Sequence, residues 1–191
     1  MNKRLFIISN RLPLTVEKDG PGHTIRQSSG GLISAISAFL NKDGKDTFTE
    51  KTWAGVPDCT QDVWKTVTSA EQTDYNYLPV FVDNKKYGAY YNGFSNSLLW
   101  PLFHYFPSFA EYHQVDFQAY VNVNQLFAEK LSAVLRNGDV VWIHDYHLLP
   151  LAGMLRKMFP ALTIGLFLHI PFPDYELFRI IPKQWQRELI T

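Results

Sequence analysis

Cysteine is nearly absent from this sequence, which has only Cys59 among 191 residues. A single cysteine excludes an internal disulfide and fits a reducing compartment. Long apolar runs are absent too, since none approaches the ~20 residues that a membrane-spanning helix needs. The apolar run before Asn10 is too short for the core of a signal peptide. We therefore expect a soluble, cytoplasmic protein.

An excess of charge of either sign is also lacking, because 18 basic residues balance 18 acidic residues. This balance indicates neither a nucleic-acid-binding surface nor a basic patch for a membrane. Charged residues make up 19% of the chain and aromatic residues 15%. So many rings beside so few charges predict an aromatic-lined cleft or a second interface. The oligomeric state stays open, with a homo-oligomer among the alternatives.

The length allows one large domain with a sizeable core, and we predict a single Rossmann-like domain over 1–191. Apolar runs of strand length alternate with helical periodicity, which predicts an α/β fold with a doubly wound parallel sheet and helices on both faces. The final helical pattern stops at Thr191 without a cap, which indicates a fragment of a longer protein. The expected strands are 5–9, 52–56, 78–82, 139–144 and 162–168, with a hairpin of 15–18 and 24–28; the expected helices are 32–40, 86–105 broken at Pro101, 117–135 capped by Asn137-Gly138, 148–159, and 176–191 interrupted at Pro182.

The segment 142–150 carries the most information about function. An apolar run stops there at His144-Asp145-Tyr146, and an apolar, helix-compatible run follows. This is typical of the carboxyl end of a buried parallel strand, the edge at which open α/β sheets bind ligands. The same pattern recurs where the run 162–168 ends in His169. We therefore expect Asp145 and His169 at the same rim of one sheet.

Two further features suggest phosphate binding. Gly30-Gly31 precedes a helix, where glycines let a ligand approach the backbone and the helix N-terminus offers free N–H groups. Arg11 follows the first strand, and its fork of donors suits a phosphate dianion. The alternatives are a tight turn for the glycines and a solvated loop residue for the arginine.

The segment 90–101 mixes aromatic rings with hydroxyl and amide groups. Rings that stack on sugar C–H faces, beside polar groups that bond hydroxyls, are typical of a carbohydrate site. A buried aromatic helix is the competing interpretation.

A cluster of His144, Asp145, His147 and His169 suggests a metal centre of hydrolase type. However, His144 and His147 lie across a strand–helix junction, where neither spacing aligns them. A carboxylate that accepts hydrogen bonds from sugar hydroxyls is the simpler interpretation. We predict no metal, and a metal-dependent phosphohydrolase stays as an alternative.

Five motifs in order make the chain resemble the N-terminal half of the trehalose-6-phosphate synthases, retaining glycosyltransferases of GT-B architecture. The resemblance covers residues 5–180, nearly the whole chain. The motifs are Ser9-Asn10-Arg11-Leu12-Pro13, Ser29-Gly30-Gly31-Leu32, Tyr91-Asn92-Gly93-Phe94-Ser95-Asn96 through Leu99-Trp100-Pro101, Trp142-Ile143-His144-Asp145-Tyr146-His147-Leu148, and Leu168-His169-Ile170-Pro171-Phe172-Pro173.

The resemblance implies transfer of glucose from UDP-glucose to glucose 6-phosphate, which gives trehalose 6-phosphate and UDP. It also implies roles for individual residues of both substrate sites. On the acceptor side, Arg11 and Tyr91 would bind the phosphate, Asp145 the hydroxyls, and Trp100 would shape the pocket. On the donor side, Gly30 and Gly31 would meet the diphosphate and His169 the sugar, with Ile170 beside the reacting centre. Asp145 and His169 are thus the expected catalytic residues.

The resemblance further implies a reaction with retention that needs no enzyme nucleophile, no metal and no cofactor, since UDP-glucose is a co-substrate. Paired carboxylates of glycosidase type are then not required. The second, nucleotide-binding domain of the family is missing from these 191 residues, so we expect the fragment alone to be inactive. A related pseudo-glycosyltransferase and a non-catalytic sugar-phosphate-sensing domain are the remaining alternatives.

Overall fold

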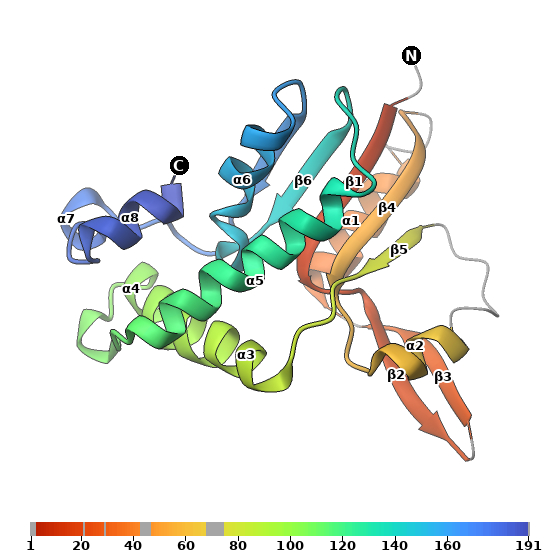
Figure 1. Ribbon diagram of the computed structural model, residues 1–191, viewed down its shortest axis with the longest axis horizontal. Helices are drawn as coiled ribbons and strands as arrows, with labels where there is room; N and C mark the ends of the chain where they lie inside the picture. Colours follow the sequence, from red (N-terminus) through yellow and green to blue (C-terminus); the bar gives the residue numbers. More distant parts are fainter. Residues whose placement is uncertain (1–2, 21, 29, 43–46, 68–74, 191) are drawn as a thin grey trace. The chain divides into compact units, whose positions relative to one another are not determined.

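The computed structural model describes residues 3–20, 22–28, 30–42, 47–67 and 75–190. The chain forms two compact units, Met1–Phe81 and Val82–Thr191. Each unit contains parallel strands accompanied by helices, which agrees with the predicted α/β class (Figure 1). Ser29 and Thr191, to which predictions from the sequence refer, lie outside the described residues.

The first unit is built on three parallel strands in the order β5-β4-β1. They are β1 (Lys3–Arg11), β4 (Phe48–Val56) and β5 (Asn76–Pro79). The first two contain the predicted runs, and the buried side chains of β1 form an almost continuous apolar core, as expected of a strand covered on both faces. The strand expected at 78–82 is displaced to β5, because only one further backbone bond, from Val80 to Gly55, continues the pairing.

A two-stranded hairpin and two helices complete the first unit. Strands β2 (Leu14–Asp19) and β3 (Gly22–Gln27) pair antiparallel as predicted, and Gly20 in their turn has a φ of 57°. Helix α1 (Gly31–Lys42) contains the predicted helix 32–40. Helix α2 (Gln61–Val67) packs beside β3 (Figure 1). Helix α2 was not predicted from the sequence, because seven residues are too few to show a clear periodicity.

The second unit contains a parallel strand pair with helices around it. Strands β6 (Val140–His144) and β7 (Thr163–Phe167) lie within the predicted runs. Between them, α6 (Leu151–Met158) starts later than the helix expected at 148–159, because Pro150 stands at its N-cap. The short helices of this region are η3 (Tyr146–Leu148), α7 (Tyr175–Phe178) and α8 (Lys183–Ile190), and Pro182 separates the last two as predicted.

Helix α5 (Gln114–Ser132) packs against α6 and against the aromatic segment that precedes it, residues 84–103 (Figure 1). Its predicted end at Asn137-Gly138 is wrong, since the helix ends at Ser132. Gly138, with a φ of 94°, serves instead in the turn that leads into β6. Gly138 thus has the positive φ that glycine adopts easily, but it has it in the turn before β6 and not at the end of α5.

The aromatic segment folds as three consecutive helices: α3 (Asn84–Gly88), the π-helix η1 (Ala89–Leu99) and α4 (Trp100–Phe103). Pro101 does not break the helix as predicted, because it lies in the first turn of α4, where its missing N–H is tolerated. The chain turns after Phe103, where Tyr105 has a φ of 65°. A short 3-10 helix, η2 (Pro107–Phe109), follows. π-Helical turns occur often at functional sites.

No helix in the described ranges combines the length and the apolar character needed to cross a membrane.

Candidate functional site

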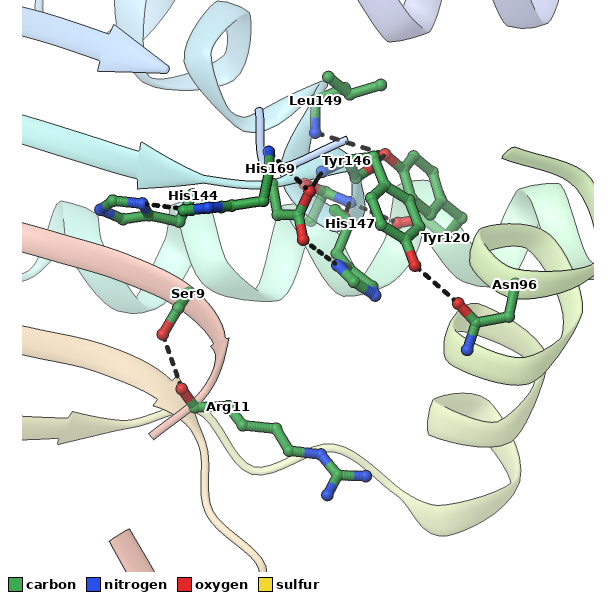
Figure 2. A network of polar contacts seen from close by, with 11 residues as sticks. Ser9, Arg11, Asn96, Tyr120, His144, Tyr146, His147, Leu149 and His169 are labelled. Atoms are coloured by element: carbon green, nitrogen blue, oxygen red, sulfur yellow. Dashed lines mark hydrogen bonds and ion pairs between the residues drawn. The ribbon is translucent and has the colours of Figure 1, made fainter. Parts of the chain in front are cut away.

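Asp145 stands at the carboxyl ends of both strands of the second unit. Its N–H donates to the carbonyl of Phe167, 2.8 Å away, at the end of β7. Its Oδ1 accepts from the main-chain N–H groups of Tyr146 at 3.0 Å and His169 at 3.3 Å (Figure 2). The prediction that Asp145 and His169 share one rim is therefore confirmed within this unit.

The backbone of Asp145 is strained, with a φ of 75° and a ψ of 167°. This region of φ and ψ is costly for any residue other than glycine, and such strain concentrates at functional sites. Burial raises the pKa of the Asp145 carboxyl, while the N–H groups of Tyr146 and His169 act in the opposite direction. The side chain keeps 23% of its surface exposed. Asp145 is thus a fixed hydrogen-bond acceptor at the strand ends.

His147 joins Asp145 to the aromatic segment. Its Nδ1 lies 3.9 Å from Oδ2 of Asp145. Its ring stacks on Tyr91 at a centroid distance of 5.3 Å and an angle of 10°, and on Tyr146 at 4.1 Å and 30°. Tyr91 stacks in turn on Tyr87 at 5.5 Å. The structure therefore brings the predicted residues Tyr91 and Asp145 into one cluster, and His147 links them.

Buried polar side chains of α5 bond the backbone of the segment that carries Tyr146 and His147. Asn124, fully buried, donates from Nδ2 to the carbonyl of His147 at 3.1 Å. The hydroxyl of Tyr120 accepts from the N–H of Leu149 at 3.3 Å and donates to the carbonyl of Tyr146. Neither Asn124 nor Tyr120 was predicted as a site residue from the sequence. The feature that could have indicated them is a pair of polar residues, four positions apart, on the apolar face of the predicted helix.

Asn96 of the aromatic segment also belongs to the cluster. Its Oδ1 accepts from the hydroxyl of Tyr146 at 2.8 Å, as Figure 2 shows. This bond ties η1 to the turn after β6. The competing interpretation of the segment 90–101 as purely buried core is incomplete, because its Tyr90 and Phe94 are buried but its Asn92 is exposed.

His144 and His169 form a second contact at the same strand ends. Nδ1 of His144 lies 3.1 Å from Nε2 of His169 (Figure 2). Burial, and to a lesser degree the charge of His169, lowers the pKa of His144 to about 4. Ile170 follows directly and is half-buried.

The contacts described for Trp100 are with His104 and not with the residues around Asp145. It stands at the start of α4 with 44% of its surface exposed. Its ring packs on His104 at 4.2 Å, and His104 Nδ1–H donates to its carbonyl at 2.7 Å. Its predicted acceptor role rests on the resemblance.

Arg11, in the first unit, ends β1 with an exposed side chain. The hydroxyl of Ser9 donates to the Arg11 carbonyl at 2.6 Å and accepts from Trp53 Nε1 at 2.8 Å. Gly55 of β4 adjoins the same backbone: a Cβ there would lie 2.6 Å from the Arg11 carbonyl carbon. The path of the chain at Arg11 is thus fixed by three neighbours.

Gly30 and Gly31, also in the first unit, precede and begin α1. A Cβ at either position would meet no described atom within 4 Å. The glycines with a positive φ in the described part of the chain are Gly20 and Gly138, and not these two. Local packing therefore gives no reason for glycine at these two positions.

Within the described ranges, no group of three His, Cys, Asp or Glu residues is arranged to hold a metal ion. The expected independence from metal stays a prediction.

An alpha,alpha-trehalose-phosphate synthase (UDP-forming) from Yarrowia lipolytica is 40% identical over 194 residues, which cover 98% of this chain and 40% of that relative. A Burkholderia xenovorans synthase of the same name, in complex with glucose-6-phosphate, superposes with a TM-score of 0.71 at 32% identity, covering 97% of this chain and 37% of that one. An E. coli structure named for trehalose-6-phosphate, bound with UDP-2-fluoro glucose, gives 0.73 at 31%, with the same coverage.

These likenesses confirm the predicted Rossmann-like α/β fold, the N-terminal half of a GT-B architecture. The chain spans 40% of the length of its relative from Yarrowia lipolytica. The family profile for glycosyltransferase family 20 matches residues 3–191, and the chain belongs to that family.

Proposed function

We propose that the full protein transfers glucose from UDP-glucose to glucose 6-phosphate, giving trehalose 6-phosphate and UDP in trehalose biosynthesis. The observation that carries this proposal is the Asp145 carboxylate, held by two main-chain N–H groups at the carboxyl end of β6. Strand ends of this kind bind ligands in open α/β sheets. The synthase relatives and the glucose-6-phosphate complex support the choice of substrates.

The acceptor sugar is assigned to Asp145 and Tyr91, which one stacked cluster connects. Asp145 accepts hydrogen bonds from sugar hydroxyls through Oδ2, since both main-chain N–H groups that bond the carboxylate in the described part of the chain go to Oδ1. Arg11 and Tyr91 bind the phosphate, and Trp100 presents its exposed ring to the sugar. The acceptor is thus held by one charge pair and several oriented polar groups.

The donor is assigned to Gly30, Gly31, His169 and Ile170. The open space around both glycines suits a diphosphate that approaches the backbone and the N-terminus of α1. His169 binds the glucosyl unit, and Ile170 lies beside the reacting centre. The UDP-2-fluoro glucose complex of the E. coli structure supports a nucleotide sugar as donor.

The transfer retains configuration without an enzyme nucleophile, and the leaving diphosphate helps to deprotonate the acceptor hydroxyl. Catalysis then consists of positioning the two substrates and stabilising the charge on the leaving group. We propose that the reaction needs neither a metal nor a cofactor and that it takes place in the cytoplasm.

The test is UDP release by the full-length protein, measured with UDP-glucose in the presence and absence of glucose 6-phosphate. Acceptor-dependent release of UDP, with trehalose 6-phosphate identified by mass spectrometry, is the expected result. A chelator should leave the rate unchanged. Release of inorganic phosphate from glucose 6-phosphate, lost on chelation, would instead support a metal-dependent phosphohydrolase. Binding of glucose 6-phosphate without turnover would support a sensing domain.

A further inference from the structure

His144 is a buried histidine to which the proposed function gives no role. It ends β6 with 1% of its surface exposed, while His169, two residues past β7, is exposed. The two rings are nearly parallel, at 24°, and their closest nitrogens lie 3.1 Å apart (Figure 2). The side chains point toward one another, so the contact is a hydrogen bond between ring nitrogens.

Only one hydrogen can occupy the line between these two nitrogens, which leaves two arrangements. If His169 donates, neutral His144 must carry its hydrogen on Nε2. That atom is buried and has no hydrogen-bond partner among the described residues. Buried N–H groups without an acceptor are rarer than buried acceptors without a donor. The arrangement in which Nδ1–H of His144 donates is therefore favoured.

His144 has a single N–H to place under ordinary conditions. Burial lowers its pKa to about 4, so the ring is neutral at neutral pH. A neutral imidazole has one donor nitrogen and one acceptor nitrogen. The hydrogen on Nδ1 thus leaves Nε2 of His144 bare in the core.

We infer that His144 is a positioning residue that donates from Nδ1 to Nε2 of His169, which fixes His169 in the tautomer whose Nδ1–H is free to donate to a ligand oxygen. Within the described residues, the His169 ring makes no other hydrogen bond. Its main-chain N–H is meanwhile held by Asp145. The ligand atom that this tautomer selects is an acceptor oxygen, such as a hydroxyl or diphosphate oxygen of a nucleotide sugar; that choice of ligand rests on the proposed function.

The assignment can be tested with substitutions that place an amide at one ring nitrogen or the other. In His144→Asn the side-chain amide nitrogen occupies the position of Nδ1, one bond from Cγ. In His144→Gln the amide lies one bond farther out, near the position of Nε2. His144→Leu removes both. His113→Asn changes an exposed histidine that faces Glu111 and serves as the matched control.

Binding of UDP-glucose to the full-length protein is then measured by calorimetry. His144→Asn should bind within about twofold of the unmodified protein, because it keeps the donor to His169. His144→Gln and His144→Leu should bind roughly three- to tenfold more weakly, the loss of one oriented hydrogen bond. Equal affinities for the Asn, Gln and Leu variants would overturn the inference.

A second measurement does not depend on any His144 variant folding. Proton–nitrogen correlation spectra of the ring of His169, assigned by their loss in His169→Gln, report its tautomer directly. Protonated Nδ1 and bare Nε2 are expected, and the reverse pattern would overturn the inference. If the expected tautomer were found but the unmodified protein did not bind UDP-glucose, the positioning role would stand and the proposed donor would be wrong.

Discussion

At the scale of single residues, Asp145 combines features that have opposite effects on stability and on binding. Its carboxylate is mostly buried, its φ is positive, and its Oδ1 is held by two N–H groups. Because burial raises its folded-state pKa, its ionised form costs stability as the pH rises above its unfolded-state pKa. A residue that served the fold alone would not be expected to carry this cost.

Asp145→Asn should therefore separate stability from function. The amide keeps the shape, tolerates a positive φ and removes the buried charge. We expect the melting temperature at pH 7 to be unchanged or higher, while kcat/KM for glucose 6-phosphate falls about ten- to a hundredfold, the loss of a charge-assisted bond. Binding of UDP-glucose should stay normal. Asp62→Asn, at an exposed position, is the control; a drop in melting temperature with unchanged kinetics would assign Asp145 a structural role.

The raised pKa of Asp145 also predicts a pH dependence. The carboxylate accepts hydroxyl hydrogen bonds only when ionised, so acceptor affinity should fall as the pH drops through the raised pKa. The acidic limb of the kcat/KM profile should lie at higher pH than for an ordinary aspartate. A profile of Asp145→Asn without this limb would confirm the origin of the effect, and an unaltered limb would refute it.

Arg11 gives a prediction about the phosphate alone. A charge-assisted bond to phosphate contributes roughly 1.5–3 kcal/mol, about one to two decades in affinity. Arg11→Ala should raise the KM for glucose 6-phosphate by that factor and leave the weak reaction with unphosphorylated glucose unchanged. Equal losses with both acceptors would mean that Arg11 acts on the fold and not on the phosphate.

At the scale of elements, the close approach of β4 to the end of β1 places Arg11. Ser9 and Trp53 hold the Arg11 carbonyl through a chain of two hydrogen bonds. Gly55 leaves room for the same backbone, since a Cβ would come within 2.6 Å of the Arg11 carbonyl carbon and the Leu12 nitrogen. Both obstacles are main-chain atoms, which cannot move aside as a flexible side chain would. The strand must therefore shift to accept any larger residue.

Gly55→Ala should destabilise the first unit by about 1–3 kcal/mol, the usual cost of overpacking. It should also raise the KM for glucose 6-phosphate, because the displaced backbone carries Arg11. Gly88→Ala is the control, since a Cβ there meets no described atom within 4 Å and alanine favours the helix. A Gly55→Ala protein with normal stability and normal KM would contradict this account.

Much of the element order could be predicted from the sequence, because the apolar runs that form β1, β6 and β7 are short and sharply bounded. The errors have local physical causes. Helix η1 follows π-helical hydrogen bonding that no apolar period encodes, and α2 is too short to show one. Of the site, Asp145 and His169 could be placed together because parallel strands end at one rim. The contribution of Asn124 could not, since its bond to the His147 carbonyl requires packing between distant segments.

At the scale of the whole molecule, this chain holds part of the residues that the proposed function requires. The 191-residue chain also spans 40% of the length of its Yarrowia lipolytica relative. In the resemblance that the sequence motifs support, the residues that clamp the UDP diphosphate lie in the second domain. The proposed function thus depends on residues of that second domain as well as on those of this chain.

The 191-residue chain, produced by itself, should consequently fold without turning over. Both units have buried apolar cores, so a cooperative unfolding transition is expected by circular dichroism. With UDP-glucose and glucose 6-phosphate it should release no more UDP than an Asp145→Asn version of the same chain, whereas the full-length protein should release it readily. The unfolding transition separates a lack of residues from misfolding. The 191-residue chain must first be shown to fold, and only then does its lack of UDP release mean that groups needed for transfer are missing from it. Acceptor-dependent UDP release by the 191-residue chain would mean that the groups essential for transfer all lie within it, and that stabilisation of the leaving diphosphate must be sought around Gly30, Gly31 and His169.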